Sequence, residues 1–191
     1  MAVKNIMIVG VGGQGTLLAS KLLGRVLLDR GFDVKVSEVH GMSQRGGSVV
    51  TYVRYGEKVY SPVIDRGEAD IILSFEQLEA ARWLEYLKPG GLIITNTQKT
   101  EPMPVITGAA VYPENLVQKM QAAGAKVDAR DFLALAEKAG SSKAVNITLM
   151  GCLSTYFPEI PEEVWQAGMD AVVPAKFREL NGRAFALGRG E

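Results

Sequence analysis

Two side chains that could do acid–base or anion-binding chemistry lie close together in SEVHGMSQRGGSVV, the segment from Ser37 to Val50. They are His40, the only histidine of the chain, and Arg45. An imidazole can move protons near neutral pH, and a guanidinium can bind a carboxylate or phosphate through two parallel hydrogen bonds. The residues between them are Gly41, Met42, Ser43 and Gln44. The segment is therefore a candidate catalytic loop, nucleotide clamp or protein contact. A solvated loop with an incidental histidine is the plainer alternative.

A second candidate site is the segment GVGGQG, in which Gly10, Gly12 and Gly15 have the spacing of a dinucleotide-binding fingerprint. The segment follows an apolar run and precedes leucines at helical spacing, which is the context that the fingerprint requires. Glycines let the backbone approach a phosphate, whose charge is stabilised by the free N–H groups of a helix start. Gly10, Gly12, Gly13, Gln14 and Gly15 are thus a candidate phosphate site, with a purely structural turn as the alternative.

One further residue supports the dinucleotide interpretation, and other features oppose it. Glu38 lies at the end of the second expected strand, roughly where a ribose-binding acid falls in dinucleotide folds. Gln14, however, places an amide side chain where those folds prefer a small residue. No arrangement of Ser, Tyr and Lys suggests hydride transfer, and His40 has no neighbour set to position it.

The single cysteine, Cys152, excludes an internal disulfide and a four-cysteine iron–sulfur cluster held by this chain alone. With one histidine, a zinc or iron site built on imidazoles is not expected either. Cys152 lies in an apolar stretch of helical character, so we expect a buried, unreactive thiol rather than a nucleophile. We therefore predict no metal site on this chain.

Charge and hydropathy exclude other classes of protein. The 21 Lys and Arg residues balance the 21 Asp and Glu residues, so no basic field attracts nucleic acid or anionic lipid. The apolar run near the N-terminus is too short for a signal-peptide core, and no segment approaches the length of a membrane span. We expect a cytoplasmic protein that binds neither nucleic acid nor membranes.

Strands and helices are expected to alternate over the first two thirds of the chain. The expected strands are residues 5–9, 33–39, 48–55, 59–61, 69–74, 92–96 and 125–127, and the expected helices are residues 16–30, 77–87, 113–123 and 131–139. Residues 5–39 would form one right-handed βαβ unit. The strands at 48–55 and 59–61 would form a hairpin through Gly56, Glu57 and Lys58.

The last third is expected to be helical, over residues 144–157, 161–173 and 174–187. The 191 residues are most simply one domain. The predicted class is α/β, with a doubly wound, mostly parallel, Rossmann-like sheet and a C-terminal helical cluster at about residues 144–188.

Four segments carry a resemblance to a known family. They are GVGGQGTLLASKLLG (10–24), SEVHGMSQRGGSVVTYVRYG (37–56), ADIILSFEQLEAARWLEYLKPGGLIITN (69–96) and VPAKFRELNGRAFALG (173–188). In this order they resemble the gamma-type subunits and domains of 2-oxoacid:ferredoxin oxidoreductases, and within that family the beta subunit of indolepyruvate:ferredoxin oxidoreductase. The pair GVGGQG and EVHGMSQRGGSV at this separation is the specific part. Residues 97–110 and those around Ser141 carry little of the resemblance.

The resemblance implies a subunit of a thiamine-diphosphate enzyme that oxidatively decarboxylates a 2-oxo acid, passes the acyl group to coenzyme A and reduces ferredoxin. For this branch it implies indolepyruvate and other arylpyruvates as substrates, within the anaerobic catabolism of aromatic amino acids. It also implies a large subunit that holds thiamine diphosphate, its magnesium ion and the [4Fe-4S] clusters. This chain would be inactive alone, and the complex would be a dimer of heterodimers.

For the candidate sites, the resemblance favours a contact of residues 40–45 with the large subunit, beside the channel for thiamine diphosphate and coenzyme A. Arg45 would bind a carboxylate, a phosphate or an acid of the partner, and His40 would act as a hydrogen-bonding positioner. The glycine loop could hold a phosphate of coenzyme A. The alternatives are a gamma subunit for pyruvate, 2-oxoisovalerate or 2-oxoglutarate, a stand-alone dinucleotide-binding oxidoreductase or regulatory domain, and a scaffold that touches no ligand.

Overall fold

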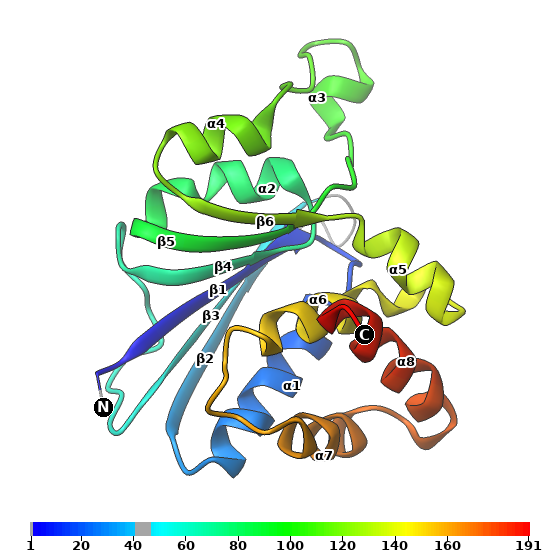
Figure 1. The fold of residues 1–191 in the computed structure, drawn as a ribbon. Helices are drawn as coiled ribbons and strands as arrows, with labels where there is room; N and C mark the ends of the chain where they lie inside the picture. The colour runs from blue at the N-terminus through cyan, green and yellow to red at the C-terminus, as the bar shows by residue number, and fades with distance from the viewer. Residues whose placement is uncertain (1, 41–46) are drawn as a thin grey trace.

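The computed structural model describes residues 2–40 and 47–191, with the side chain of His40 excepted. Within these ranges six strands form one sheet in the order β2-β3-β1-β4-β5-β6 (Figure 1). Their bounds are β1 Lys4–Val11, β2 Asp33–His40, β3 Ser48–Gly56, β4 Ala69–Ser74, β5 Leu87–Asn96 and β6 Lys126–Arg130. Strands β1, β4, β5 and β6 pair in parallel, whereas β3 is antiparallel to both β1 and β2. The expected α/β class with a mostly parallel sheet is confirmed.

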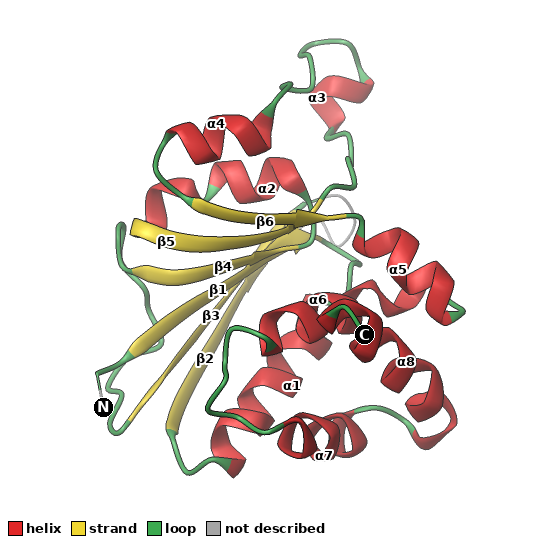
Figure 2. Cartoon of the chain, in the orientation of Figure 1, coloured by secondary structure: helices red, strands yellow, loops and turns green. Residues whose placement is uncertain are grey.

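Helices cover both faces of this sheet (Figure 2). Their bounds are α1 Thr16–Asp29, α2 Gln77–Arg82, α3 Met103–Ile106, α4 Leu116–Ala122, α5 Phe132–Ala139, α6 Val145–Ser154, α7 Glu162–Val172 and α8 Arg178–Arg189. Helices α2 and α4 lie over one face, and α1 and α6 lie against the other, backed by α7 and α8. The C-terminal helical cluster expected from the sequence is therefore present.

The apolar core is divided by the sheet into two clusters, and β1 contributes to both. Ile6 and Ile8 pack with α1 and α6 on one face, while Met7 and Val9 pack with residues of β5 and α4 on the other. A strand buried on both faces carries a continuous apolar run instead of an alternating one. This is why NIMIV could be identified as a central strand from the sequence.

The helical cluster is held together by a close contact between α6 and α8. A Cβ atom added at Gly188 would lie 2.0 Å from the carbonyl oxygen of Thr148, and one added at Gly151 would lie 2.1 Å from the carbonyl oxygen of Phe185. The two helix backbones therefore touch where each carries a glycine. Any larger residue at these positions would have to separate the helices.

The expected hairpin of residues 48–55 with 59–61 is wrong, because β3 pairs with β2 and β1 instead. Residues 59–61 form no strand. The backbone N–H of Val59 donates instead to Oδ2 of Asp33, at 2.9 Å, and the Val59 side chain is buried. The expected βαβ unit is also altered, since β3 lies between β1 and β2. Periodicity alone identified these strands but could not decide their order.

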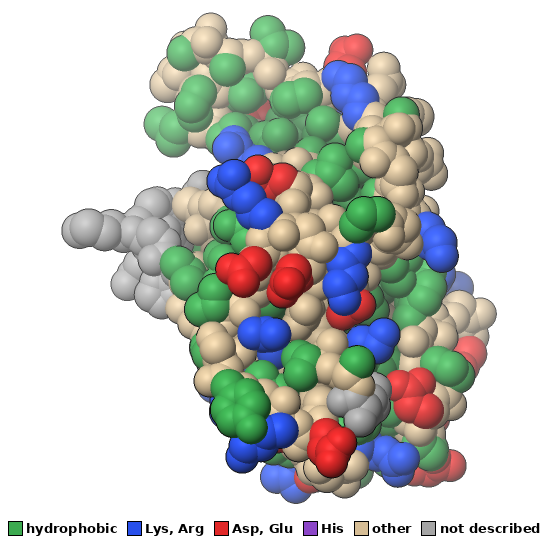
Figure 3. Space-filling model, turned by 90° about the vertical axis from the view of Figure 1, so that its left-hand side faces the viewer, with side chains coloured by type: hydrophobic (Ala, Val, Ile, Leu, Met, Phe, Trp, Pro, Cys, Tyr) green, Lys and Arg blue, Asp and Glu red, His purple; other side chains and the backbone are tan. Residues whose placement is uncertain are grey.

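The surface bears charges of both signs, interspersed on the face drawn in Figure 3. Every helix within residues 2–40 and 47–191 is too short or too polar to cross a membrane.

Candidate functional site

The glycine loop connects β1 to α1 in a turn that its own glutamine stabilises. The side chain of Gln14 folds back, so that its Oε1 accepts a hydrogen bond of 2.7 Å from the N–H of Val11. A Cβ atom at Gly10 would lie 2.7 Å from this oxygen and 3.0 Å from Cβ of Phe75. Gln14 therefore supports the turn, and Gly10 is required by close packing.

The start of α1 is open at this loop. Gly15 precedes the helix with φ 89°, and no side chain of the described residues caps the helix. Gly13 also has a left-handed φ of 96°. Uncapped N–H groups at a helix start carry a partial positive charge and favour a bound anion. The geometry thus retains both alternatives, a phosphate site and a structural turn.

A cavity of about 740 Å³ lies beside the loop, within the usual range for small-molecule sites. Four polar residues from distant segments also line it, namely Gln98, Thr100, Ser142 and Lys143. Lys143 forms no ion pair within the part of the chain that the structure describes, so its charge is available to an anion in the cavity. None of these four residues could be identified from the sequence, because nothing local in the sequence connects them with the glycine loop.

Asn146, on α6, supports the glycine loop through a contact with Gly15. Its Nδ2 lies 3.5 Å from the carbonyl oxygen of Gly15, and a Cβ atom at Gly15 would lie only 2.8 Å from that nitrogen. The Asn146 side chain is buried, so α6 supports the loop directly.

Glu38 does not have the position of a ribose-binding acid. In a dinucleotide fold the second strand is the direct neighbour of the first. Here β3 separates them, which moves Glu38 to about two strand spacings, or about 10 Å, from β1. Glu38 faces Thr51 across the β2–β3 ladder, and its Oε2 is buried with no hydrogen-bond partner among the described residues, as is Oγ1 of Thr51. The sheet order therefore argues against the dinucleotide interpretation.

Gly41, Met42, Ser43, Gln44 and Arg45 lie outside the described residues, as does the side chain of His40. The structure does place the residues on either side of this segment. Strand β2 ends at His40, and β3 begins at Ser48. The carbonyl oxygen of Gly47 accepts a hydrogen bond of 2.9 Å from the N–H of Gly12. The backbone that flanks the histidine–arginine segment is therefore bonded to the glycine loop, at the carboxyl edge where ligands of α/β sheets gather.

Two buried carboxylates support this edge. Glu79 accepts a hydrogen bond of 2.5 Å from the hydroxyl of Ser48 and pairs with Arg82 at 3.1 Å. Burial raises the pKa of the Glu79 carboxyl above its usual value, although the hydrogen bond from Ser48 and the charge of Arg82 oppose this. Glu76 caps α2 by accepting hydrogen bonds from the N–H groups of Leu78 and Glu79, at 2.7 and 3.0 Å. Neither carboxylate had a predicted role from the sequence.

Cys152 is fully buried, as expected from its apolar surroundings. Burial and the neighbouring carboxylate of Asp128 raise the pKa of its thiol to about 12. Its Sγ donates to Oδ2 of Asp128 at 3.3 Å. A thiol with this pKa is a poor nucleophile at neutral pH. Within residues 2–40 and 47–191, no group of three His, Cys, Asp or Glu side chains could hold a metal ion.

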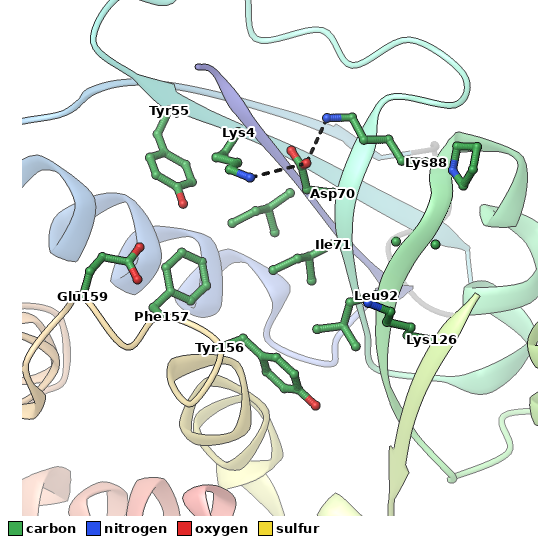
Figure 4. Close-up of a pocket in the computed structure, with 14 residues that line it drawn as sticks. Lys4, Tyr55, Asp70, Ile71, Lys88, Leu92, Lys126, Tyr156, Phe157 and Glu159 are labelled. Carbon is green, nitrogen blue, oxygen red and sulfur yellow. Dashed lines mark hydrogen bonds and ion pairs between the residues drawn. The ribbon is translucent and has the colours of Figure 1, made fainter. Parts of the chain in front are cut away.

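A second cavity, of about 560 Å³, lies near the amino ends of the parallel strands, at the end of the sheet opposite to the glycine loop (Figure 4). Asp70 binds Lys88 at 2.9 Å and lies 3.9 Å from Lys4, so one carboxylate partly neutralises two of its lysines. Ile71 and Leu92 lie between these charges and the aromatic rings of the helical side. This cavity was not predicted from the sequence, and none of the residues that line it belongs to the glycine loop.

Comparison with known proteins gives a family match over nearly the whole chain and relatives that cover 76–96% of it. The family model described as pyruvate ferredoxin/flavodoxin oxidoreductase matches residues 5–191. The chain is 46% identical over 191 residues to the indolepyruvate oxidoreductase subunit IorB of Thermococcus kodakarensis, with 96% of this chain and 93% of the relative covered. It is 44% identical over 189 residues to the subunit of the same name from Pyrococcus horikoshii, with the same coverage of 96% and 93%. Against the pyruvate/ketoisovalerate oxidoreductases common subunit gamma of Thermococcus litoralis, identity is 24% over 147 residues, covering 76% of this chain and 73% of that subunit.

Solved structures share the fold at lower identity. Pyruvate oxidoreductase subunit PORC from Thermotoga maritima superimposes with a TM-score of 0.76 at 20% identity, covering 100% of this chain and 97% of that one. The 2-oxoglutarate:ferredoxin oxidoreductase from Magnetococcus marinus gives a TM-score of 0.75 at 19% identity, covering 100% of this chain but 31% of that chain. The same fold therefore occurs both as a separate chain and as part of a longer one.

Proposed function

Because the chain belongs to the pyruvate ferredoxin/flavodoxin oxidoreductase family, whose model matches residues 5–191, we propose that it is the small subunit of an indolepyruvate:ferredoxin oxidoreductase. The observation that carries this proposal is the 46% identity to an indolepyruvate oxidoreductase subunit, across 93% of that subunit. The gamma subunit of the pyruvate/ketoisovalerate enzymes is less similar, at 24% identity. Indolepyruvate is thus favoured over pyruvate, 2-oxoisovalerate and 2-oxoglutarate.

The proposed complex oxidatively decarboxylates indolepyruvate and other arylpyruvates, forms the arylacetyl-CoA and reduces ferredoxin. Thiamine diphosphate, its magnesium ion and [4Fe-4S] clusters, held by the large subunit, supply the decarboxylation and electron-transfer chemistry when bound. One cysteine and one histidine are too few for this chain to hold such a cluster by itself. The assembly would be a dimer of heterodimers in the cytoplasm, inactive without the large subunit.

We assign the glycine-loop cavity of this chain to a phosphate of coenzyme A. The open start of α1 and the charge of Lys143, which has no ion-pair partner among residues 2–40 and 47–191, both favour an anion there. Replacing Lys143 by Ala should raise the KM for coenzyme A and leave the KM for indolepyruvate unchanged. Lys138→Ala is the matched control, because Lys138 is exposed on α5 and does not line the cavity. Equal values of KM for coenzyme A in both variants would leave the glycine loop with a structural role only.

We place the segment of His40 and Arg45 against the large subunit, beside the same cavity. The support is the hydrogen bond between Gly12 and Gly47, which joins the backbone next to this segment to the glycine loop. Arg45 would bind a substrate carboxylate, a phosphate or a partner acid, and His40 would position a reacting group by hydrogen bonding.

The proposed function is tested by coexpression with the large subunit and purification of the complex. Ferredoxin reduction is then measured with coenzyme A and each of four 2-oxo acids: indolepyruvate, pyruvate, 2-oxoisovalerate and 2-oxoglutarate. We expect the highest kcat/KM for indolepyruvate. A higher kcat/KM for one of the other three would assign the chain to that branch. Saturable binding of a nicotinamide dinucleotide to the isolated chain would favour the stand-alone oxidoreductase instead.

A further inference from the structure

An uncharged projection stands out from the body of the molecule between β5 and α4. We call residues 102–111 the arm; it contains the short helix α3 and reads PMPVITGAAV, without a charged residue. In Figure 1 the arm extends beyond the layer formed by α2 and α4. None of these ten residues is charged, although 22% of the residues of the chain are.

The arm exposes large apolar side chains. Met103 is 65% exposed, Ile106 is 60% exposed and Val111 is 88% exposed. Hydrophobic side chains gather at the top of the face drawn in Figure 3, over the arm. Single exposed apolar residues are ordinary, but a gathering on one uncharged projection is typical of a surface that another molecule covers.

A buried carboxylate fixes the two residues that flank the arm, Thr100 and Tyr112, which we call its neck. Oε1 of Glu76 accepts a hydrogen bond of 3.2 Å from the N–H of Thr100, before the arm, and another from the hydroxyl of Tyr112, after it. Glu76 is 1% exposed, and its other oxygen caps α2. Burying a carboxylate is costly unless it is fully hydrogen-bonded, as this one is. The neck therefore holds the arm away from the body.

The arm is also ordered internally. The N–H groups of Thr107 and Ala110 donate to the carbonyl oxygens of Met103 and Pro104, both at 2.9 Å. The hydroxyl of Thr107 donates to the carbonyl oxygen of Met103 at 3.0 Å. A preorganised segment loses less conformational entropy on binding than a flexible one. The arm thus has the properties of a rigid docking element.

We propose that the arm docks into an uncharged, apolar groove on the large subunit; this rests on the proposed function. A charged groove would bury charges for which the arm offers no partner. The arm also begins where the candidate site ends, since Gln98 and Thr100 line the glycine-loop cavity immediately before it. A large subunit seated on the arm would therefore also border that cavity, where both subunits have to meet for the proposed reaction.

The test compares the variants Met103→Asp and Val111→Asp with Leu28→Asp. Leu28 lies on α1, outside the arm, and is exposed to a similar degree, 57%, so it is the matched control. Affinity for the large subunit is measured by titration, and the melting temperature of each isolated variant reports on folding. We expect both arm variants to bind at least about tenfold more weakly, while Leu28→Asp binds like the wild type. All three should melt like the wild type, because the substituted side chains are exposed.

Arm variants that bind the large subunit as tightly as the wild type would overturn the docking proposal and leave the proposed function intact. Weaker self-association of the isolated chain, with unchanged binding of the large subunit, would assign the arm to a second copy of this chain and also overturn it. A wild-type chain that does not bind the large subunit at all would overturn both the proposed function and the docking proposal.

Discussion

Glu79 illustrates how a single residue connects the candidate site with stability. Its carboxylate is buried at the carboxyl edge of the sheet and accepts a hydrogen bond from the hydroxyl of Ser48, the first residue of β3. Its raised pKa means that the folded protein binds a proton there more tightly than the unfolded chain does. The protonated Glu79 carboxyl therefore contributes its full stabilisation below the unfolded pKa of 4.5. This stabilisation is lost as the pH rises through the higher pKa that Glu79 has in the folded protein.

Replacing Glu79 by Gln should remove this pH dependence, because the amide resembles the protonated carboxyl. We expect the melting temperature of Glu79→Gln minus that of the wild type to be larger at pH 7.5 than at pH 4. Thermal unfolding of both proteins across this range measures the effect. Parallel curves for the two proteins would contradict the prediction.

Arg45 is best tested by a change that keeps its charge. Arg45→Lys retains the positive charge but loses the planar guanidinium that binds an anion through two hydrogen bonds. We expect a complex that still assembles, with turnover or coenzyme A use reduced about tenfold or more, equivalent to about 1.4 kcal/mol of transition-state stabilisation. If turnover and coenzyme A use are unchanged in both Arg45→Lys and His40→Ala, the segment has only a structural role.

At the scale of single residues, the sequence predicted what depends on local pattern. The glycine loop was identified because its fingerprint is contiguous, and the burial of Cys152 followed from its apolar neighbours. Lys143 and Gln98 were not identified, because Lys143, just before α6, and Gln98, just after β5, come close to the loop only in the folded chain. The supporting role of Gln14 was also missed, since a side chain folding back on its own turn leaves no periodic signal.

At the scale of elements, the strands were recognisable but their order was not. Residues 33–39 alternate like a strand and residues 48–55 are rich in β-branched and aromatic residues, but neither pattern says which neighbour a strand will take. The structure pairs them with each other and inserts β3 beside β1. Residues 59–61 have the composition of a strand, yet a hydrogen bond from Val59 to Asp33 leaves them outside the sheet. Tertiary contacts decided these cases.

The contact between α6 and α8 makes a sharp prediction about two glycines on one helix. Gly188→Ala would place a methyl group against the carbonyl of Thr148, so we expect a loss of about 1–3 kcal/mol in the free energy of unfolding. Gly182→Ala, also on α8, meets no atom within 4 Å and should gain up to about 1 kcal/mol from helix propensity. Chemical denaturation of both variants measures the difference. Equal stability of the two variants would show that α8 can move away from α6 at little cost.

At the scale of the whole molecule, the chain should fold without performing the reaction. We expect the chain purified alone to have no visible absorbance and no 2-oxo acid oxidation, because it has one cysteine and one histidine with which to hold a redox centre. Absorbance spectroscopy, iron analysis and an assay with indolepyruvate test this directly. Stoichiometric iron, flavin absorbance or turnover by the lone chain would contradict the prediction.

The hydrogen bonds of Glu76 also determine how the protein would tolerate a break in its backbone within the arm. Thr100 and Tyr112, on either side of the arm, both donate hydrogen bonds to the same carboxylate. If the backbone were cut within the arm, these two bonds would still hold its two ends close together. The two resulting pieces would still be joined by the pairing of β5 with β6 and by the packing of α1 on α7. Expressed as separate polypeptides divided within the arm, they should reassemble into one particle with the sheet order of the intact chain. The arm is thus a natural place to divide this protein into two complementing fragments.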